Sequence, residues 1–124
     1  LDGNAAVILS YFTSFNRGQY QQAASLFAPD GSLHPPFESP IVGPEQIARY
    51  FFKEADGMTI SLSTADTQPL GDGRLQVNAW GRVAAFVFQV NAAWYFIVSA
   101  EREIESLQIE LLATPEELLQ IRPD

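Results

Sequence analysis

The stretch from residue 10 to residue 33, SYFTSFNRGQYQQAASLFAPDGSL, decides how the chain begins to fold. Its first part belongs to a predicted helix over 4–15, because large apolar residues recur there at the spacing of one helical face. These residues are Val7, Ile8, Tyr11, Phe12 and Phe15. Asn4 is the expected N-cap of this helix. Gly18 is the expected stop, since glycine readily adopts the left-handed conformation that ends many helices.

Two more helices and a short strand are predicted from the residues that follow. A second helix is expected over 19–27, and Pro29-Asp30-Gly31 is typical of a turn. We expect a short strand at 32–33, followed by an irregular, proline-rich loop. Pro44 stands at the start of a third predicted helix, where proline is favoured. Gly57 ends that helix.

From Met58 onward the apolar residues repeat with a period of about 2 instead of about 3.6, which indicates strands. The predicted strands are 58–67, 74–90, 91–100 and 103–113, and Gly81 in the second suggests a bend or bulge. A capping box at the C-terminal end predicts a tail helix over about 114–122. We therefore expect one α+β domain over 1–124, with three N-terminal helices packed on a curved, mostly antiparallel sheet. Such a curled sheet would enclose an apolar pocket.

Composition excludes several classes of function. The 124 residues carry a formal net charge of −8, which disfavours nucleic acids and anionic lipid surfaces as partners. There is no cysteine, so disulfides, thiol catalysis and cysteine-bound metals are excluded, and no other residue pattern predicts a metal site. No apolar run is long enough for a transmembrane helix, and no signal peptide is visible. We expect a cytoplasmic protein without an integral membrane segment.

Several motifs resemble a known superfamily. The stretch quoted above and IVGPEQIARYF at 41–51 are similar to the opening of the nuclear transport factor 2-like superfamily. A narrower resemblance covers almost the whole chain. LHPPFESPIVG at 33–43, VNAAWYFIV at 90–98 and LLATPEELLQIR at 111–122 resemble the C-terminal domain of the cyanobacterial orange carotenoid proteins and its free-standing homologues. This resemblance implies a carotenoid carrier or a light-sensing, regulatory domain in photoprotection.

The resemblance also implies a ligand and its contacts. The ligand would be a ketocarotenoid: echinenone, canthaxanthin or 3′-hydroxyechinenone. In that family a tyrosine of the first helix and a tryptophan of a central strand donate hydrogen bonds to the terminal carbonyl, and they match Tyr11 and Trp94. A second family tryptophan is matched by Val87, which departs from the pattern. The other expected ligand contacts are Phe15, Met58, Leu107, Ile109 and Leu111. The implied protein partner is a second copy, forming a homodimer, or an all-helical carotenoid-binding domain.

The chemistry of the residues themselves separates a binding site from an active site. A buried phenol and a buried indole each need an acceptor, so two such donors aimed at one point can hold a carbonyl oxygen. Ketosteroid isomerases of the same superfamily add an aspartate base to a tyrosine and a protonated aspartic acid. The position of that base is matched by Pro35, which cannot transfer a proton. His34, the single histidine, is expected to point away, because neighbouring strand residues face opposite sides.

Three functions stay open on the sequence. The first is the non-catalytic carotenoid-binding module. The second is an isomerase-like enzyme that acts on a small apolar carbonyl compound. The third is a ligand-free dimerisation domain whose pocket is filled by its own side chains.

Overall fold

The computed structural model describes residues 3–113. The three helices are α1 (Gly3–Asn16), α2 (Tyr20–Ser25) and α3 (Pro44–Glu54). The strands are β1 (Phe27–His34), β2 (Ile41–Val42), β3 (Met58–Gly71), β4 (Arg74–Ala85), β5 (Phe88–Val98) and β6 (Ile104–Leu111). This confirms the predicted α+β class. The predicted tail helix over 114–122 lies outside the described residues.

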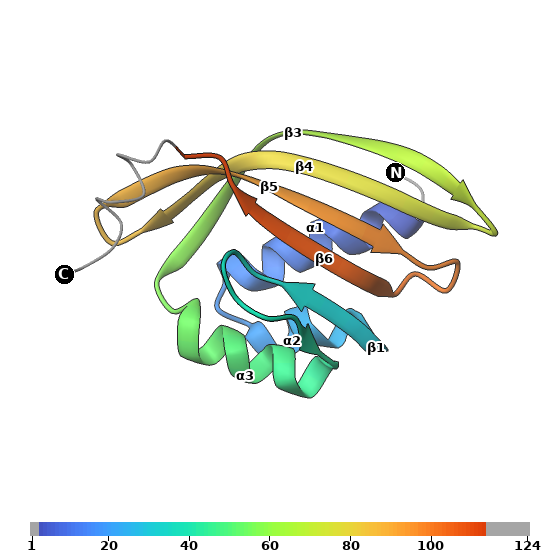
Figure 1. The fold of residues 1–124 in the computed structure, drawn as a ribbon, viewed down its shortest axis with the longest axis horizontal. Helices are drawn as coiled ribbons and strands as arrows, with labels where there is room; N and C mark the ends of the chain where they lie inside the picture. The colour runs from blue at the N-terminus through green and yellow to red at the C-terminus, as the bar shows by residue number, and fades with distance from the viewer. Residues whose placement is uncertain (1–2, 114–124) are drawn as a thin grey trace.

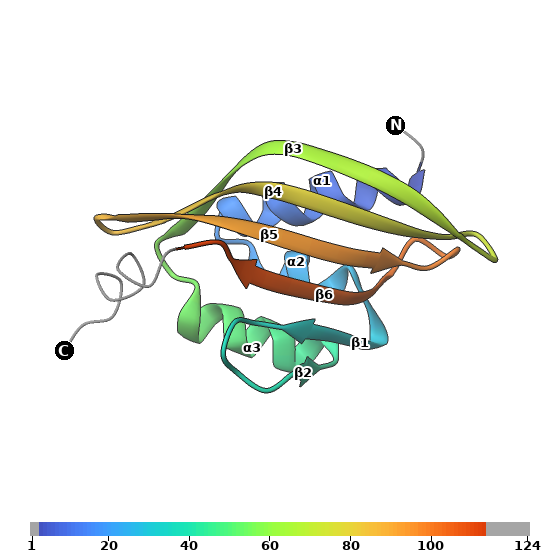
Figure 2. The same ribbon diagram turned by 45° about the horizontal axis from the view of Figure 1, so that its top comes forward.

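The six strands form one sheet in the order β2-β1-β6-β5-β4-β3. Neighbouring strands run antiparallel except β1 and β6, which run parallel. Figure 1 shows the sheet arched over α1, with α2 and α3 on the same side. Figure 2 shows the strands from the outer side, with β3 at one edge. One face of the sheet is therefore covered by helices. None of the described helices is long and apolar enough to cross a bilayer.

Helix α1 has the apolar face that its sequence predicts, because Val7, Ile8, Tyr11, Phe12 and Phe15 are all buried. Its end is a Schellman motif built on glycine. The Gln19 amide donates to the Ser14 carbonyl at 2.9 Å and the Gly18 amide to the Phe15 carbonyl at 3.0 Å, with Gly18 at φ 72°. The predicted start is wrong by one position, since the helix already includes Gly3 and Asn4 lies within it.

The second helix is shorter and the first strand longer than predicted. Helix α2 ends at Ser25, and β1 begins at Phe27. The Ile104 amide donates to the Leu26 carbonyl at 2.9 Å, so tertiary pairing with β6 overrides the local helical pattern. The predicted turn at Pro29-Asp30-Gly31 is instead a bulge inside β1, because the register with β6 shifts between Phe27 and Ser32. Proline cannot donate to a strand ladder, which explains why the strand bulges there.

Helix α3 begins at Pro44, one residue after Gly43 (φ 92°), and Gly57 (φ 82°) follows its end. The start agrees with the sequence, whereas the helix ends at Glu54, three residues before the predicted end at Gly57. The loop before α3 contains a strand that was not predicted, β2, which has only two residues and pairs with Ser32 and Leu33 of β1. A two-residue strand is too short to show an alternating pattern.

The predicted strand over 74–90 is wrong, because the chain reverses at Phe86 and Val87 and forms the β4–β5 hairpin. Its two-residue turn contains none of the glycine, asparagine or aspartate residues that signal such turns. Gly81 does lie opposite a bulge, as suggested, but the bulge belongs to β3, between Leu62 and Thr64. The alternation along β5 is as expected: Trp94 and Phe96 are buried on the inner face, whereas Tyr95 faces outward and donates to Glu110 Oε1 at 3.0 Å.

Candidate functional site

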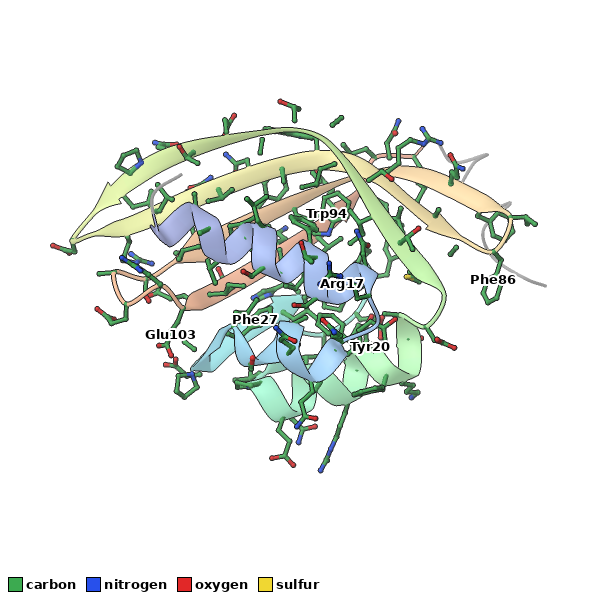
Figure 3. All side chains as sticks on the ribbon, turned by 180° about the vertical axis from the view of Figure 1, so that it is seen from behind. Arg17, Tyr20, Phe27, Phe86, Trp94 and Glu103 are labelled. Carbon is green, nitrogen blue, oxygen red and sulfur yellow. The ribbon has the colours of Figure 1, made fainter. Side chains whose placement is uncertain are left out.

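The two predicted donors lie in the core between α1 and the inner face of the sheet. Trp94 pairs with Ala79 of β4 on one side and Ile109 of β6 on the other, in the middle of the sheet. Tyr11 reaches the same layer from α1. Each of the two side chains is 1% exposed. Figure 3 shows Trp94 between α1 and the strands.

Aromatic rings surround both donors. The Tyr11 ring lies 5.2 Å from Phe12 and 5.5 Å from Phe96, both in edge-to-face geometry. The Trp94 indole lies 5.5 Å from Phe12, with ring planes at 88°. Tyr11 and Trp94 do not stack on each other and share no hydrogen bond. Phe12 therefore contacts both donors, and the space under the curved sheet is filled by aromatic side chains of α1.

Burial determines the protonation state of Tyr11. Removal of the phenol from water disfavours its charged form, so burial raises the pKa of Tyr11 far above its ordinary value. The hydroxyl group is a neutral donor throughout the physiological range. The buried polar or charged side chains among the described residues are Ser14 and Ser99, so no described carboxylate or imidazole shares this core.

Most of the other predicted contact residues border the same core. Phe15 is 6% exposed and lies in edge-to-face contact with Tyr20 and Phe51. Met58 is half-buried against the core at the start of β3. Leu107, Ile109 and Leu111 follow one another along the inner side of β6, opposite Phe96, Trp94 and Ala92. These positions form an apolar row that leads away from Tyr11.

Val87 is the predicted contact that the structure does not place with the others. It lies at the tip of the β4–β5 hairpin and is 88% exposed. Its neighbour Phe86, at 91% exposed, projects from the same tip (Figure 3). Both side chains are exposed because residues 74–90 form a hairpin instead of the predicted continuous strand, and Phe86 and Val87 lie at its turn.

The residues considered for proton transfer lie as the strand alternation predicts. Leu33 and Pro35 are buried, and His34 between them is half-buried. The His34 ring nitrogen Nε2 lies 2.9 Å from the Ser32 hydroxyl oxygen, two residues away on the same face of β1. Within the described part of the chain, no group of three or more histidine or acidic side chains could hold a metal ion.

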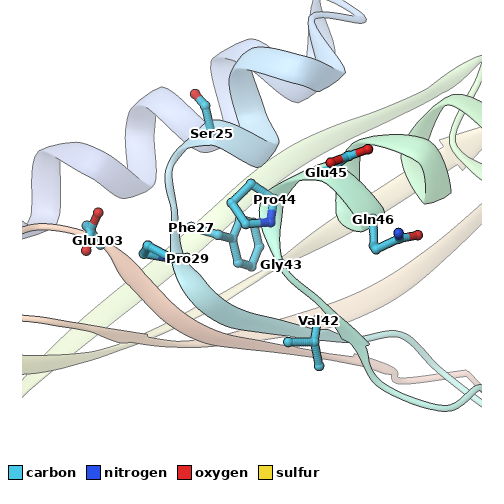
Figure 4. Close-up of a pocket in the computed structure, with 9 residues that line it drawn as sticks. All are labelled: Ser25, Phe27, Pro29, Val42, Gly43, Pro44, Glu45, Gln46 and Glu103. Atoms are coloured by element: carbon cyan, nitrogen blue, oxygen red, sulfur yellow. The ribbon is translucent and has the colours of Figure 1, made fainter.

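A cavity of about 610 Å³ opens at a different place, which the sequence did not predict. We call it the β1–α3 groove. Its lining residues are Ser25, Phe27, Pro29, Val42, Gly43, Pro44, Glu45, Gln46 and Glu103 (Figure 4). The sequence did indicate an irregularity at Pro29, but it predicted a turn there rather than a bulge within β1. Phe27 separates this groove from the core, since its ring lies 6.2 Å from Tyr11.

The fold agrees with what comparison with known proteins shows. Residues 4–109 match the family model of the Nuclear transport factor 2 (NTF2) domain. The chain therefore belongs to the NTF2 domain family.

Its relatives within that family confirm the narrower resemblance as well. The chain is 36% identical over 118 residues to the orange carotenoid-binding protein of Synechocystis sp. and 34% identical over 120 residues to that of Limnospira maxima. These matches cover 92% and 94% of this chain but only 37% and 38% of the relatives. The solved structure of the Anabaena (Nostoc) sp. orange carotenoid protein binding canthaxanthin superposes with a TM-score of 0.82 at 34% identity, over 92% of this chain and 38% of that one.

Proposed function

We propose that this chain is a non-catalytic module that binds a ketocarotenoid, with Tyr11 and Trp94 as donors to its terminal carbonyl group. The observation that carries the proposal is the placement of both donors in one aromatic core, each 1% exposed and each against Phe12. The relatives named for carotenoid binding, and the relative solved with canthaxanthin, support this class of ligand. Echinenone, canthaxanthin and 3′-hydroxyechinenone are the candidate pigments.

The two donors and the apolar surface would have different tasks. A neutral hydrogen bond contributes only about 0.5–1.5 kcal/mol net. Burial of roughly 200 Å² of polyene surface would contribute about 5 kcal/mol at 25 cal/mol per Å². Affinity would therefore come mainly from contacts with Phe15, Met58 and the β6 row, Leu107, Ile109 and Leu111. Tyr11 and Trp94 would fix the orientation of the ring. Val87, at the hairpin tip, would touch the pigment only where it leaves the domain.

The isomerase-like alternative lacks a base. Such an enzyme needs an acid–base group within hydrogen-bond reach of the substrate. Among the described residues, no aspartate, glutamate or histidine is buried with Tyr11, Pro35 stands at the matching position, and His34 lies on the other face of β1. This supports a carbonyl-binding site without proton transfer.

The wider role follows from the relatives and is part of the proposal. The chain spans less than two fifths of their length, 37% and 38%. It would act in the cytoplasm of a cyanobacterium, as a carotenoid carrier or as the light-sensing, regulatory part of a photoprotective system. Its partner would be a second copy of the chain or an all-helical carotenoid-binding domain. Light would act by breaking the hydrogen bonds from Tyr11 and Trp94 to the carbonyl oxygen.

Absorption spectroscopy tests the binding proposal. Purified protein mixed with canthaxanthin should develop a red-shifted visible band. Tyr11→Phe and Trp94→Phe should each lower the affinity roughly 2- to 10-fold, the loss of one neutral hydrogen bond, and shift the band. Tyr95→Phe is the matched control, because it removes the same hydroxyl group from the outer face of the sheet. No band in the wild type, or a band unchanged in both variants, would contradict the proposal.

One observation favours the ligand-free domain as a second candidate. The donors are enclosed by the chain's own rings, and Phe12 occupies the position beside both of them. A protein of this kind would produce no red-shifted band with any of the three pigments and would form a dimer in sedimentation equilibrium.

A further inference from the structure

The β1–α3 groove is an open depression at the junction of four chain segments. Ser25 at the end of α2, Phe27 and Pro29 of β1, the run from Val42 to Gln46, and Glu103 before β6 line it (Figure 4). The bulge in β1 creates the opening, because it displaces Pro29 and its neighbours from the regular ladder with β6. Bulges of this kind are frequent beside functional sites.

Main-chain hydrogen bonds hold the walls of the groove in place. The Gly43 amide donates to the Gly31 carbonyl at 2.8 Å, which ties the start of α3 to β1. The Glu103 amide donates to the Ser99 hydroxyl at 3.1 Å, and the Ser99 amide donates to the Glu103 carbonyl at 2.8 Å. The groove is thus a preformed feature of the backbone, and a ligand would not need to order it.

The floor and rim of the groove are apolar. Phe27, Pro29, Val42 and Pro44 provide this surface. Val42 is 56% exposed, which leaves a β-branched apolar side chain in water. Contact with the carbon atoms of a ligand would remove that exposure.

Among the described residues, Glu103 is the charged lining residue of the groove that has no ion pair. The other charged lining residue is Glu45, which forms an ion pair with Arg49 at 2.9 Å. Glu45 also lies in the first turn of α3, where it offsets the partial positive charge of about half a unit at a helix N-terminus. Glu103 forms no ion pair with any other side chain that the structure describes. Among the residues that the structure describes, no lysine, arginine or histidine lines the groove. A cationic group on an occupant would complement this carboxylate.

We propose that the β1–α3 groove binds an extended segment of a partner protein that carries an arginine between apolar residues. The guanidinium group would pair with Glu103, and the aliphatic stem would lie on Pro29, Val42 and Pro44. Arginine suits this position better than lysine, because its planar group presents several donors to a carboxylate and is less strongly hydrated. A segment of a larger partner suits it better than a small molecule, because small-molecule sites enclose most of their ligand and this depression is open.

Peptide titration followed by amide NMR tests this proposal. The probe is acetyl-Leu-Arg-Pro-Leu-amide, and its control is the same peptide with neutral citrulline in place of arginine. At physiological salt the arginine peptide should shift the amide signals of Gly43, Gln46 and Glu103. The citrulline peptide should bind roughly fivefold more weakly, the upper end of the effect expected for an exposed charge pair.

The matched variants are Glu103→Gln and Glu101→Gln, which change the net charge equally in the same turn. Glu103→Gln should weaken the binding of the arginine peptide about fivefold, and Glu101→Gln should weaken it by less than about twofold. The proposal is overturned if the two variants weaken binding equally, because the peptide would then only sense the acidic surface. It is also overturned if no groove signal moves. If the groove amide signals of the free protein shift on dilution and its mass in sedimentation changes, the occupant is a second copy of the chain. That result would also overturn the proposal.

Discussion

The ring of Phe12 meets the indole of Trp94 edge to face, with centroids 5.5 Å apart and planes at 88°. The same ring lies 5.2 Å from Tyr11. Since both proposed donors are 1% exposed, a carbonyl oxygen reaches them only after a neighbouring side chain moves. Phe12 is the described aromatic side chain in contact with both, so its displacement should control the entry of a ligand.

Replacing Phe12 with leucine should make pigment uptake faster, because a smaller and more flexible side chain covers Trp94. We expect a loss of stability of about 1–2 kcal/mol, within the range for core substitutions of this size. Stopped-flow absorption after mixing with canthaxanthin measures the rate. Phe37→Leu is the control, because Phe37 is 85% exposed. Equal rates of pigment uptake in the wild type and in Phe12→Leu would show that Phe12 does not control the entry of the ligand.

The buried Tyr11 should destabilise the protein at alkaline pH. In the unfolded chain the pKa of this phenol is near its ordinary value of 10.0, whereas burial raises its pKa in the folded state. Above about pH 10 the unfolded state therefore binds fewer protons than the folded state, and stability falls as pH rises. The stabilising contribution is fully present below pH 10. It should decline by about 1.4 kcal/mol per pH unit above it.

Urea unfolding between pH 8 and pH 11 measures this slope, with Tyr11→Phe as the comparison. The variant should lose stability less steeply above pH 10 than the wild type. Some slope should remain, because burial also raises the pKa values of Tyr20, Tyr50 and Tyr95. Identical slopes in the two proteins would show that Tyr11 ionises as easily in the folded state as in the unfolded one.

The tip of the β4–β5 hairpin should become more stable when Phe86 is replaced by glycine. Phe86 has φ 56°, and it is the first residue of a two-residue turn in which glycine is favoured at that position. Relief of the left-handed conformation should raise the free energy of unfolding by about 1 kcal/mol. Val87→Gly is the matched control and should lower it, since Val87 has no positive φ. Chemical denaturation distinguishes the two outcomes, and a destabilised Phe86→Gly would refute the argument.

The helices and their glycine ends were predictable because their signals are local. The apolar face of α1, the stop at Gly18 and the start of α3 at Pro44 each depend on a few neighbouring residues. The errors occur where distant pairing decides the outcome. Phe27 continues a helical pattern but pairs with Ile104 of β6. The residues near Phe27 or near Ile104 in the sequence do not indicate this pairing.

The candidate site was predictable only in part. Strand alternation was enough to place Trp94 on the inner face and His34 on the other side of its strand. The position of Val87 was not predictable, because the turn at Phe86 lacks turn-forming residues. The β1–α3 groove was not predictable either, since it exists only where β1, α3 and the turn at Glu103 meet in space.

Replacing Gly81 with alanine should destabilise the protein strongly. A Cβ atom at this position would lie 2.3 Å from the Ser61 carbonyl oxygen and 2.9 Å from the Leu62 Cα, both of them main-chain atoms next to the β3 bulge. Because neither atom can move without shifting the strand, we expect a loss of about 2–3 kcal/mol in chemical denaturation. Gly18→Ala is the comparison, since a Cβ atom there meets open space and only the φ of 72° opposes it. That variant should lose about 1 kcal/mol. If the two losses were equal, or their order reversed, close packing against β3 would not be the reason for glycine at position 81.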